Sequence, residues 1–431
     1  MRQWVCAEEA IGTINPGDHV VLPPGCSEVL TFEREIERQS ERLIGLNVFS
    51  GLLLGDYPFI SKNCQIAYTT YHIMGPIREL VEKGKAHFLP ISGSRVPELF
   101  KGGQLRADVA LIHVSPPNGE GFCSFGVSVS YPFSVARIAE RVIAQVNPRM
   151  PRTQGRCTIH ISEIDLMVEV DDPLVEYGPP AVDEISRVIG ESVLERIPNG
   201  AVLQIGLGSI PEAVLSSIPG TNINNLTFFG MGTDGMVELI ESGHIHNRNA
   251  KRPIIVATEL MGSKKLFDYA HENSMVEMRP SEHVLNSTVA SEYDHFISVN
   301  SALQIDLYGQ VNSEYIAGRH MGGIGGSMDF IQAARMSNGG ETIIAFPAAD
   351  SKKKHSRIVS KFPAGTPINV PRHMVETVVT EFGMVHLKGL NLVERAEALI
   401  SIADPLFRPG LEETLFQRPT VAGARDREVE V

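Results

Sequence analysis

The sequence predicts an α/β protein with two lobes, each built on a largely parallel sheet. Short β-rich runs alternate with helix-like stretches along the chain, a pattern typical of βα units. The length of 431 residues exceeds what one hydrophobic core usually serves, so two domains of roughly 200 residues each are expected. A segment rich in acids, proline and glycine, residues 168–184, separates two such series and marks the boundary.

In the first lobe, apolar runs predict strands at residues 19–24, 107–114 and 142–147, and the segment PIRELVEKG predicts a helix at 76–84. We place the boundary near residue 180. The prediction is therefore an N-terminal α/β domain of residues 1–180 and a C-terminal α/β domain of residues 181–431.

The second lobe opens with a predicted helix at residues 184–197 and a strand at Val202–Ile205. This strand runs into Gly206-Leu207-Gly208 and then a helix from about Pro211. A glycine turn lets backbone approach a ligand and directs helix N–H groups at an anion. Glycine also serves such turns for steric reasons alone, so both interpretations stay open.

Two more glycine-rich loops are candidates for ligand contact. Residues 322–326 hold four glycines in five positions, which costs folding entropy and favours a close approach to a ligand or a sharp bend. Residues 118–126 follow a predicted strand, at the end of an open α/β sheet where ligands usually bind.

Composition excludes several classes of function. Hydrophobic residues make up 43% and charged residues 21%, and no run of about 18 apolar residues could span a bilayer. The first residues lack the apolar stretch of a signal peptide, so we expect a cytoplasmic protein. A net charge of −13 argues against nucleic acid as a partner. The short basic run at residues 352–357 is either a solvated loop or a contact to ligand phosphates.

The cysteines indicate neither disulfides nor a metal site. Their number is odd, they are widely spaced and no CxxC pair occurs, so we expect reduced thiols and no metal. The five are Cys6, Cys26, Cys64, Cys123 and Cys157.

Ordered blocks along nearly the whole chain carry a family resemblance. They are GCSE at 25–28, the loop at 119–128, QIGLGSIPEAV at 204–214, DGMVELIESG at 234–243, MGSKKLFDY at 261–269, SVNSALQIDLYGQVNSE at 298–314, GIGGSMDF at 323–330, KHSRIV at 354–359 and VTEFGMVHLKGLNLVERAEALI at 379–400. The chain resembles the acetyl-CoA hydrolase/transferase family, class I CoA-transferases that include 4-hydroxybutyrate and butyrate CoA-transferases.

The resemblance implies two similar α/β lobes in the class I CoA-transferase fold, with the active site in the cleft between them. It implies acyl-CoA and a carboxylic acid as small-molecule substrates, a role in acyl-CoA and carboxylic acid metabolism, no metal, and a homo-oligomer. The residues it assigns to coenzyme A are Ile205, Gly206, Leu207, Gly208, Ser209, Gly325, Gly326 and Lys354.

Family members work by ping-pong, in which a glutamate attacks the thioester and then carries coenzyme A as a glutamyl thioester. The site must desolvate this carboxylate and stabilise the oxyanion with backbone donors, which the glycine loops could supply. Relatives have a pattern like His-Thr-Glu-Met-x-x-Asp-Gly. Residues 228–235 read Phe-Phe-Gly-Met-Gly-Thr-Asp-Gly, so Gly230 takes the glutamate position and the nucleophile is absent there.

Three alternatives follow. CoA transfer persists with a relocated carboxylate, the candidates being Asp234, nearest in sequence, and Glu28, Glu120 or Glu259. Alternatively, thioester binding persists and the reaction changes to hydrolysis, acyl transfer or decarboxylation in the room vacated at Gly230. In the third, the chain binds acyl-CoA without catalysis. Because Phe228 and Phe229 flank Gly230, we also expect a drier acyl pocket than in relatives.

Other nucleophiles and bases are weaker candidates. Cys26 and Cys123 fall in loops that the resemblance places near the cleft, yet no adjacent histidine supports their activation. His113, His320 and His355 are expected to be structural or surface residues.

Overall fold

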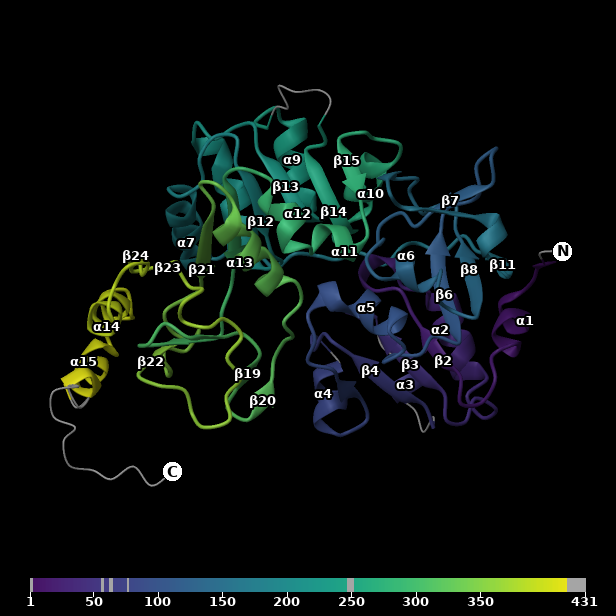
Figure 1. The fold of residues 1–431 in the computed structure, drawn as a ribbon, viewed down its shortest axis with the longest axis horizontal. Helices are drawn as coiled ribbons and strands as arrows, with labels where there is room; N and C mark the ends of the chain where they lie inside the picture. The colour runs from purple at the N-terminus through teal and green to yellow at the C-terminus, as the bar shows by residue number, and fades with distance from the viewer. Residues whose placement is uncertain (1–2, 56–57, 62–64, 76, 246–251, 417–431) are drawn as a thin grey trace.

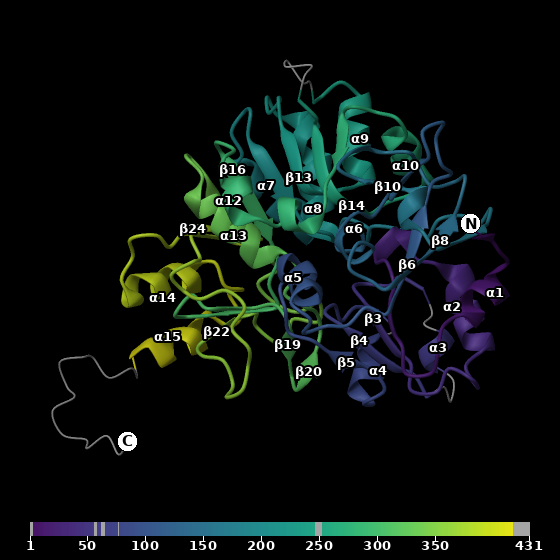
Figure 2. The same cartoon turned by 45° about the vertical axis from the view of Figure 1, so that its right-hand side comes forward.

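The computed structural model describes residues 3–55, 58–61, 65–75, 77–245 and 252–416 of the chain (Figure 1). Within these residues, two mostly parallel sheets lie beside each other, each with helices packed around it, which confirms the predicted class (Figure 2). The strands of the first sheet come from residues 3–169. Those of the second come from residues 202–386, apart from one short strand described below.

The first sheet has eight strands, and every pair in it is parallel. In spatial order they are β1 (Gln3–Trp4), β11 (Leu166–Glu169), β8 (Arg141–Val146), β6 (Val109–Val114), β2 (His19–Val21), β3 (Asn47–Ser50), β4 (Ala67–Thr70) and β5 (His87–Phe88). The central strand β6 is buried along its whole length, because helices cover both faces of a parallel sheet.

The second sheet has nine strands, all parallel except the pair β23 and β24. In spatial order they are β24 (Gly383–His386), β23 (Thr377–Thr380), β21 (Glu341–Ala345), β16 (Phe296–Asn300), β12 (Val202–Ile205), β13 (Thr227–Gly232), β14 (Ile255–Leu260), β15 (Val276–Met278) and β9 (Gln154–Gly155). The strand predicted at Val202–Ile205 is β12, and it lies in the middle of this sheet.

The helices of the first lobe are short. They are α1 (Ala7–Gly12), α2 (Leu30–Arg38), α3 (Pro58–Ser61), α4 (Ile77–Glu82), α5 (Val96–Lys101) and α6 (Pro132–Val135). Around the second sheet lie α7 (Glu184–Leu194), α8 (Ser209–Ser217), α9 (Asp234–Glu241), α10 (Lys264–Ala270), α11 (Ser281–Val284), α12 (Ser287–Ser291) and α13 (Ser327–Met336). The helix predicted from about Pro211 begins two residues earlier, at Ser209.

Backbone contacts join the two lobes. Strand β9 leaves the first half of the chain and pairs with β15 at the edge of the second sheet. In addition, the amide of Leu260 donates to the carbonyl of Val127 at 2.8 Å, and that of Val129 donates to Thr258 at 3.0 Å. The end of β14 is therefore held directly against the first lobe. The largest buried apolar cluster likewise contains residues of both lobes.

The C-terminal part of the chain adds a smaller unit beside the second sheet, where α14 (Leu392–Ser401) and α15 (Arg408–Phe416) lie at its outer end (Figure 1). Its strands are β17 (Gln304–Asp306), β18 (Val311–Asn312) and β22 (Ile358–Val359), with the hairpin β19 (Tyr315–Ile316) and β20 (Arg319–His320). The remaining pair, β7 (Phe122–Ser124) and β10 (Thr158–His160), belongs to the first lobe. No helix in the described part of the chain has the length and apolarity to cross a membrane.

Candidate functional site

A cavity of about 300 Å³ lies where the two lobes meet. The first lobe contributes Pro24, Leu52, Tyr71, His72, Gly93 and Ser130 to its wall. The second lobe contributes residues at the carboxyl ends of four neighbouring parallel strands: Ile205 at the end of β12 and Gly206 after it, Gly230 and Met231 in β13, Glu259 in β14 and Asn300 in β16. Both lobes are therefore needed to form the cavity.

The topology of the second sheet places the cavity at its switch point. From β12 the chain proceeds to β13, β14 and β15 on one side, and then returns to place β16 on the other side of β12. Loops leaving neighbouring strands in opposite directions open a crevice at that point, where ligands of open α/β sheets bind. The Gly206–Gly208 turn leaves β12 directly into this crevice.

Two helix N-termini border the cavity. Helix α8 begins after Gly208 and helix α13 begins after Gly326, and in the part of the chain that the structure describes neither has a side-chain cap. Gly206, Leu207, Gly326 and Ser327, which lie at these two ends, line the cavity. Backbone N–H groups in the first turn of a helix have no partner within the helix, and with the helix dipole they favour a negative charge. The cavity is therefore suited to an oxyanion or another anionic group.

The glycine-rich loop before α13 needs its glycines because it lies close to the first lobe. A Cβ atom at Gly323 would stand 2.4 Å from the carbonyl oxygen of Tyr71, and one at Gly325, whose φ is +55°, would stand 3.1 Å from Cε1 of His72. The amide of Gly93 donates to the carbonyl of Gly325 at 2.8 Å. Hydrogen bonds from Ser92 and Ser94 to the Asp329 carboxylate fix the start of α13 to the same lobe.

Gly230 lines the cavity in a backbone conformation that disfavours any other residue. Its φ is +117°, which side chains rarely tolerate. A Cβ atom would stand 3.1 Å from Cζ of Phe330, a ring carried by α13. A side chain here would therefore need a strained backbone and a shift of Phe330 by a few tenths of an ångström. Whether the cavity beside Gly230 admits water or another acceptor stays a prediction.

Among the described residues, Glu259 is the acid that lines this cavity. It lies one strand away from Gly230, at the carboxyl end of β14. The parallel register runs from Gly230 paired with Ala257 to Met231 paired with Glu259, so Thr258 forms a bulge. A bulge shifts the side chains that follow it by one position and often occurs beside active sites.

The surroundings of Glu259 are mostly apolar or neutral. Burial raises the pKa of its carboxyl from 4.5 to about 7, and a hydrogen bond with Ser130 opposes this rise in part. The side chain keeps partial exposure on the side of the cavity. Gly25 lies close to this carboxylate: a Cβ atom there would stand 3.1 Å from Oε2 of Glu259 and 2.9 Å from Sδ of Met261.

Two ring side chains complete the wall near Glu259. Burial raises the pKa of Tyr71 strongly, so this phenol stays protonated, and it shares the hydrogen bond partner Ser130. Burial lowers the pKa of His72 to about 4, so its imidazole is neutral at pH 7. The Nδ1 atom of His72 is buried and has no hydrogen bond partner within the described residues.

The structure brings together most residues predicted to contact coenzyme A. Ile205, Gly206, Leu207, Gly325 and Gly326 line the cavity. Gly208 and Ser209 follow in the same turn but lie outside its lining. Lys354 also lies outside it, on an exposed loop where its amide donates to Asp350 at 2.8 Å.

Asp234, the residue predicted as a substitute nucleophile, does not line the cavity. Its carboxylate accepts hydrogen bonds from the Ser263 amide at 2.8 Å, the Ser263 hydroxyl at 3.0 Å and the Leu266 amide at 3.2 Å. These contacts hold the start of α10 against α9. The physical reason is local: the acid follows the end of β13 and satisfies the N–H groups of a neighbouring helix.

The other candidate acids are also engaged elsewhere. Glu28 is buried and its carboxylate accepts hydrogen bonds from the amides of Leu54 and Gly55. Glu120 is exposed on its loop. The expected dry acyl pocket of Phe228 and Phe229 is wrong as well: both rings are buried in apolar clusters on the two faces of the sheet, and neither lines the cavity.

The candidate thiols and histidines lie outside the cavity lining. Burial raises the pKa of Cys26 to about 12 and that of Cys123 to about 11, so both thiols are protonated at pH 7. Cys64 lies outside the described residues. His113 is buried with Nδ1 3.0 Å from the carbonyl oxygen of Glu28, His320 packs on Phe88, and His355 is exposed beside Asp350. The described residues contain no cluster of three or more His, Cys, Asp or Glu that could hold a metal.

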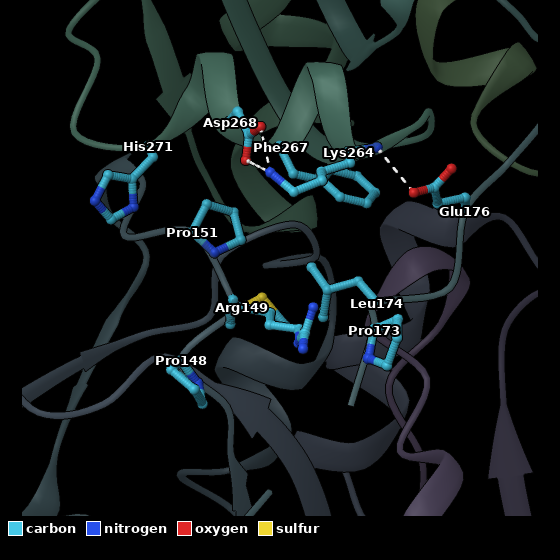
Figure 3. Close-up of a pocket in the computed structure, with 11 residues that line it drawn as sticks. Pro148, Arg149, Pro151, Pro173, Leu174, Glu176, Lys264, Phe267, Asp268 and His271 are labelled. Atoms are coloured by element: carbon cyan, nitrogen blue, oxygen red, sulfur yellow. Dashed lines mark hydrogen bonds and ion pairs between the residues drawn. The ribbon is translucent and has the colours of Figure 1, made fainter. Parts of the chain in front are cut away.

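A second cavity, of about 260 Å³, occurs elsewhere between the lobes (Figure 3). It lies between residues 148–151 and 173–176 of the first lobe and helix α10. Its charged side chains have local partners, because Lys264 pairs with Asp268 and Arg149 pairs with Asp171. The backbone amide of Lys264 also donates to Glu176 at 3.2 Å. With its charges paired, this cavity is a weaker candidate for binding an anion.

Comparison with known proteins agrees with the geometry. The models of the acetyl-CoA hydrolase/transferase N-terminal and C-terminal domains match residues 1–177 and 262–415. The 4-hydroxybutyrate coenzyme A transferase of Clostridium kluyveri is 40% identical over 97% of this chain and 98% of its own length. The succinyl-CoA:acetate/propanoyl-CoA:succinate CoA transferase of Fasciola hepatica is 34% identical over 95% of this chain and 87% of its own.

Two solved structures extend the likeness to the fold. RipA from Yersinia pestis has a TM-score of 0.87 and 30% identity, covering 96% of this chain and 97% of its own. The 4-hydroxybutyrate CoA-transferase from Porphyromonas gingivalis has a TM-score of 0.80 and 34% identity, covering 96% of this chain and 98% of its own. The two-lobed arrangement is therefore shared with both of these proteins.

Proposed function

The chain belongs to the acetyl-CoA hydrolase/transferase family, and from this premise we propose that it transfers coenzyme A from an acyl-CoA to a second carboxylic acid. It is an enzyme of coenzyme A thioesters. Such a transfer needs a carboxylate nucleophile, a site for the thioester oxyanion and exclusion of water.

The observation that carries the proposal is the meeting of these three features at one cavity. Glu259 provides a carboxylate in mostly apolar surroundings, and the N-termini of α8 and α13 provide backbone donors beside it. Gly206, Leu207, Gly325 and Gly326 allow the backbone to approach a thioester closely. The neutral side chains of Tyr71 and His72 add no competing charge.

The size of the cavity favours a short acyl group. About 300 Å³ is the lower end of what ligand pockets offer, and it suits a thioester with a few carbons rather than a long chain. In this proposal the nucleotide end of coenzyme A extends toward the outside. We place this end of coenzyme A along Gly208 and Ser209, and Lys354 contacts one of its phosphates.

The test is a transfer assay with a panel of acyl-CoA donors from two to eight carbons and acetate or butyrate as acceptor. We expect acetyl-CoA or butyryl-CoA to form in amounts equal to the acid released, with parallel lines in initial-rate plots that indicate ping-pong kinetics. Free coenzyme A accumulating without a new thioester would favour hydrolysis instead. Tight thioester binding without turnover would favour a binding protein.

Three further features belong to the proposal on the basis of sequence and family alone: a cytoplasmic location, assembly as a homo-oligomer and a reaction without a metal. Sedimentation velocity tests the second of these. Activity after dialysis against a chelator tests the third.

A further inference from the structure

We propose that Glu259 is the catalytic carboxylate of this enzyme, and that it replaces on strand β14 the nucleophile absent from Gly230 on β13. The inference rests on the proposed function and names the residue that performs it. It depends on the position of Glu259, on the space around its carboxylate, and on the hydrogen bonds that hold the other candidate acids elsewhere.

The position follows from the register of two neighbouring strands. Gly230 and Glu259 lie at the carboxyl ends of β13 and β14 and line the same cavity. The bulge at Thr258 puts Glu259, rather than Thr258, opposite Met231. The carboxylate of Glu259 on β14 therefore lies at the same cavity as the glutamate position of the family on β13.

The packing around Gly230 and around Glu259 agrees with a carboxylate on β14 in place of one on β13. At residue 230 a side chain would be strained by the positive φ and would crowd Phe330, and at residue 25 the absence of a side chain leaves room for the Glu259 carboxylate. The Ser128–Glu259 backbone bridge, together with the hydrogen bonds on either side of it, fixes this part of β14 against the first lobe. The carboxylate is thus held on rigid backbone, as a nucleophile requires.

No other acid lines this cavity among the described residues. Asp234 and Glu28 have their oxygens engaged by backbone amides, and Glu120 is exposed. The titratable groups that interact electrostatically with Glu259 are Cys26, Tyr71 and Tyr131, and burial keeps all three protonated and neutral at pH 7. Poor solvation makes a carboxylate more reactive toward a thioester.

The chemical steps balance without an outside reagent. A Glu259 oxygen bonds to the thioester carbonyl carbon, the C–S bond breaks, and the coenzyme A thiolate leaves behind a mixed anhydride. The thiolate then bonds to Cδ of Glu259 and releases the first acid as its carboxylate. The second carboxylate reverses both steps, takes coenzyme A and restores Glu259.

The experiment follows the covalent intermediate in the full-length enzyme. Wild type and the Glu259→Gln, Glu259→Asp and Asp234→Asn variants are incubated with butyryl-CoA without acceptor, digested at low pH and mapped by mass spectrometry. We expect a coenzyme A adduct on the peptide that contains Glu259 in wild type and in Asp234→Asn, and none in Glu259→Gln. Transfer to acetate should fall by at least about 1,000-fold in Glu259→Gln and remain within several-fold in Asp234→Asn.

Circular dichroism and butyryl-CoA affinity separate loss of chemistry from loss of folding. We expect Glu259→Gln to keep its fold and to bind butyryl-CoA within a few-fold of wild type. Glu259→Asp, which keeps a shorter carboxylate, should retain a small fraction of transfer and serves if the glutamine variant does not fold.

The outcomes distinguish this inference from the proposed function. Transfer that survives in Glu259→Gln, or an adduct on a different acid, overturns the role of Glu259 and leaves CoA transfer intact. Hydrolysis through an adduct on Glu259, without transfer to any acid, supports the nucleophile and overturns the transferase. Wild-type turnover without any adduct at Glu259 overturns the inference.

Discussion

Phe330 crowds the position of a side chain on residue 230, since its Cζ atom lies 3.1 Å from the position of a Cβ atom on Gly230. The ring also packs edge-on against Phe229 and stacks with Phe296, so it belongs to a buried aromatic cluster that resists displacement. Restoring the family's glutamate at this position would therefore require a strained backbone and a small shift of the ring.

We expect Gly230→Ala to lower the free energy of unfolding by roughly 1–3 kcal/mol, because it combines a positive φ with a close contact. Gly230→Glu should be less stable still and gain no transfer activity. Urea unfolding measures the first effect and the transfer assay measures the second.

A matched double variant identifies the cause. Adding Phe330→Leu to Gly230→Ala should recover part of the stability if the ring is the obstacle, giving a coupling energy of about 0.5–2 kcal/mol. A Gly230→Glu enzyme that is stable and more active than wild type would contradict this explanation of the departure from the family.

Much of the fold follows from the sequence because local patterns dictate it. The buried run Val109–Val114 and the strand Val202–Ile205 with its glycine turn lie where they were predicted, and the helix predicted at 184–197 is α7, which ends at Leu194. The contacts of the Gly322–Gly326 loop with Tyr71 and His72 could not be predicted, because they join residues about 250 positions apart.

The candidate site was predicted only in part for the same reason. Glycine turns and the absence of a glutamate at Gly230 are visible in the sequence, whereas the choice of Glu259 among several acids depends on a bulge and on the register of two strands. Tyr71 and Ser130 lie in no recognised motif, and Phe330 ends the GIGGSMDF block without a role that the sequence could assign. For Glu259 the one signal available was an acid at the end of an apolar strand, IIVATEL.

The space beside Gly25 gives a prediction that is specific to the reaction. In Gly25→Ala the new methyl group would press on Oε2 of Glu259 and Sδ of Met261, so we expect transfer to fall by at least about tenfold through misplacement of the carboxylate. The control is Gly17→Ala, which also has a positive φ but meets nothing within 4 Å of the new atom. Gly17→Ala should lose roughly 1 kcal/mol of stability and Gly25→Ala roughly 1–3 kcal/mol, while only Gly25→Ala should lose activity.

Glu259 also makes stability depend on pH. Its folded pKa of about 7 lies above the ordinary value of 4.5, so between these values the folded protein retains a proton that the unfolded chain has released. Stability from this group is therefore greatest below pH 4.5 and falls as the pH rises toward 7. We expect Glu259→Gln to be more stable than wild type by about 1–3 kcal/mol at pH 8 and equally stable near pH 4.5. Urea unfolding of both proteins across this range tests the sign, and a variant less stable at pH 8 would contradict it.

Ser130 affects the pKa of Glu259 and, through it, the pH at which the transfer rate rises. Its hydrogen bond stabilises the Glu259 carboxylate, so removing it in Ser130→Ala should raise the pKa of Glu259 further. Because the nucleophile must be ionised, kcat/KM for transfer should rise with pH to a plateau, with a midpoint near 7 in wild type and a higher midpoint in Ser130→Ala. Ser128→Ala is the matched control, since the Ser128 hydroxyl is buried nearby and has no partner within the described residues. If both serine variants shift the midpoint equally, the effect comes from packing in this segment; if neither does, the group that limits the rate is not Glu259.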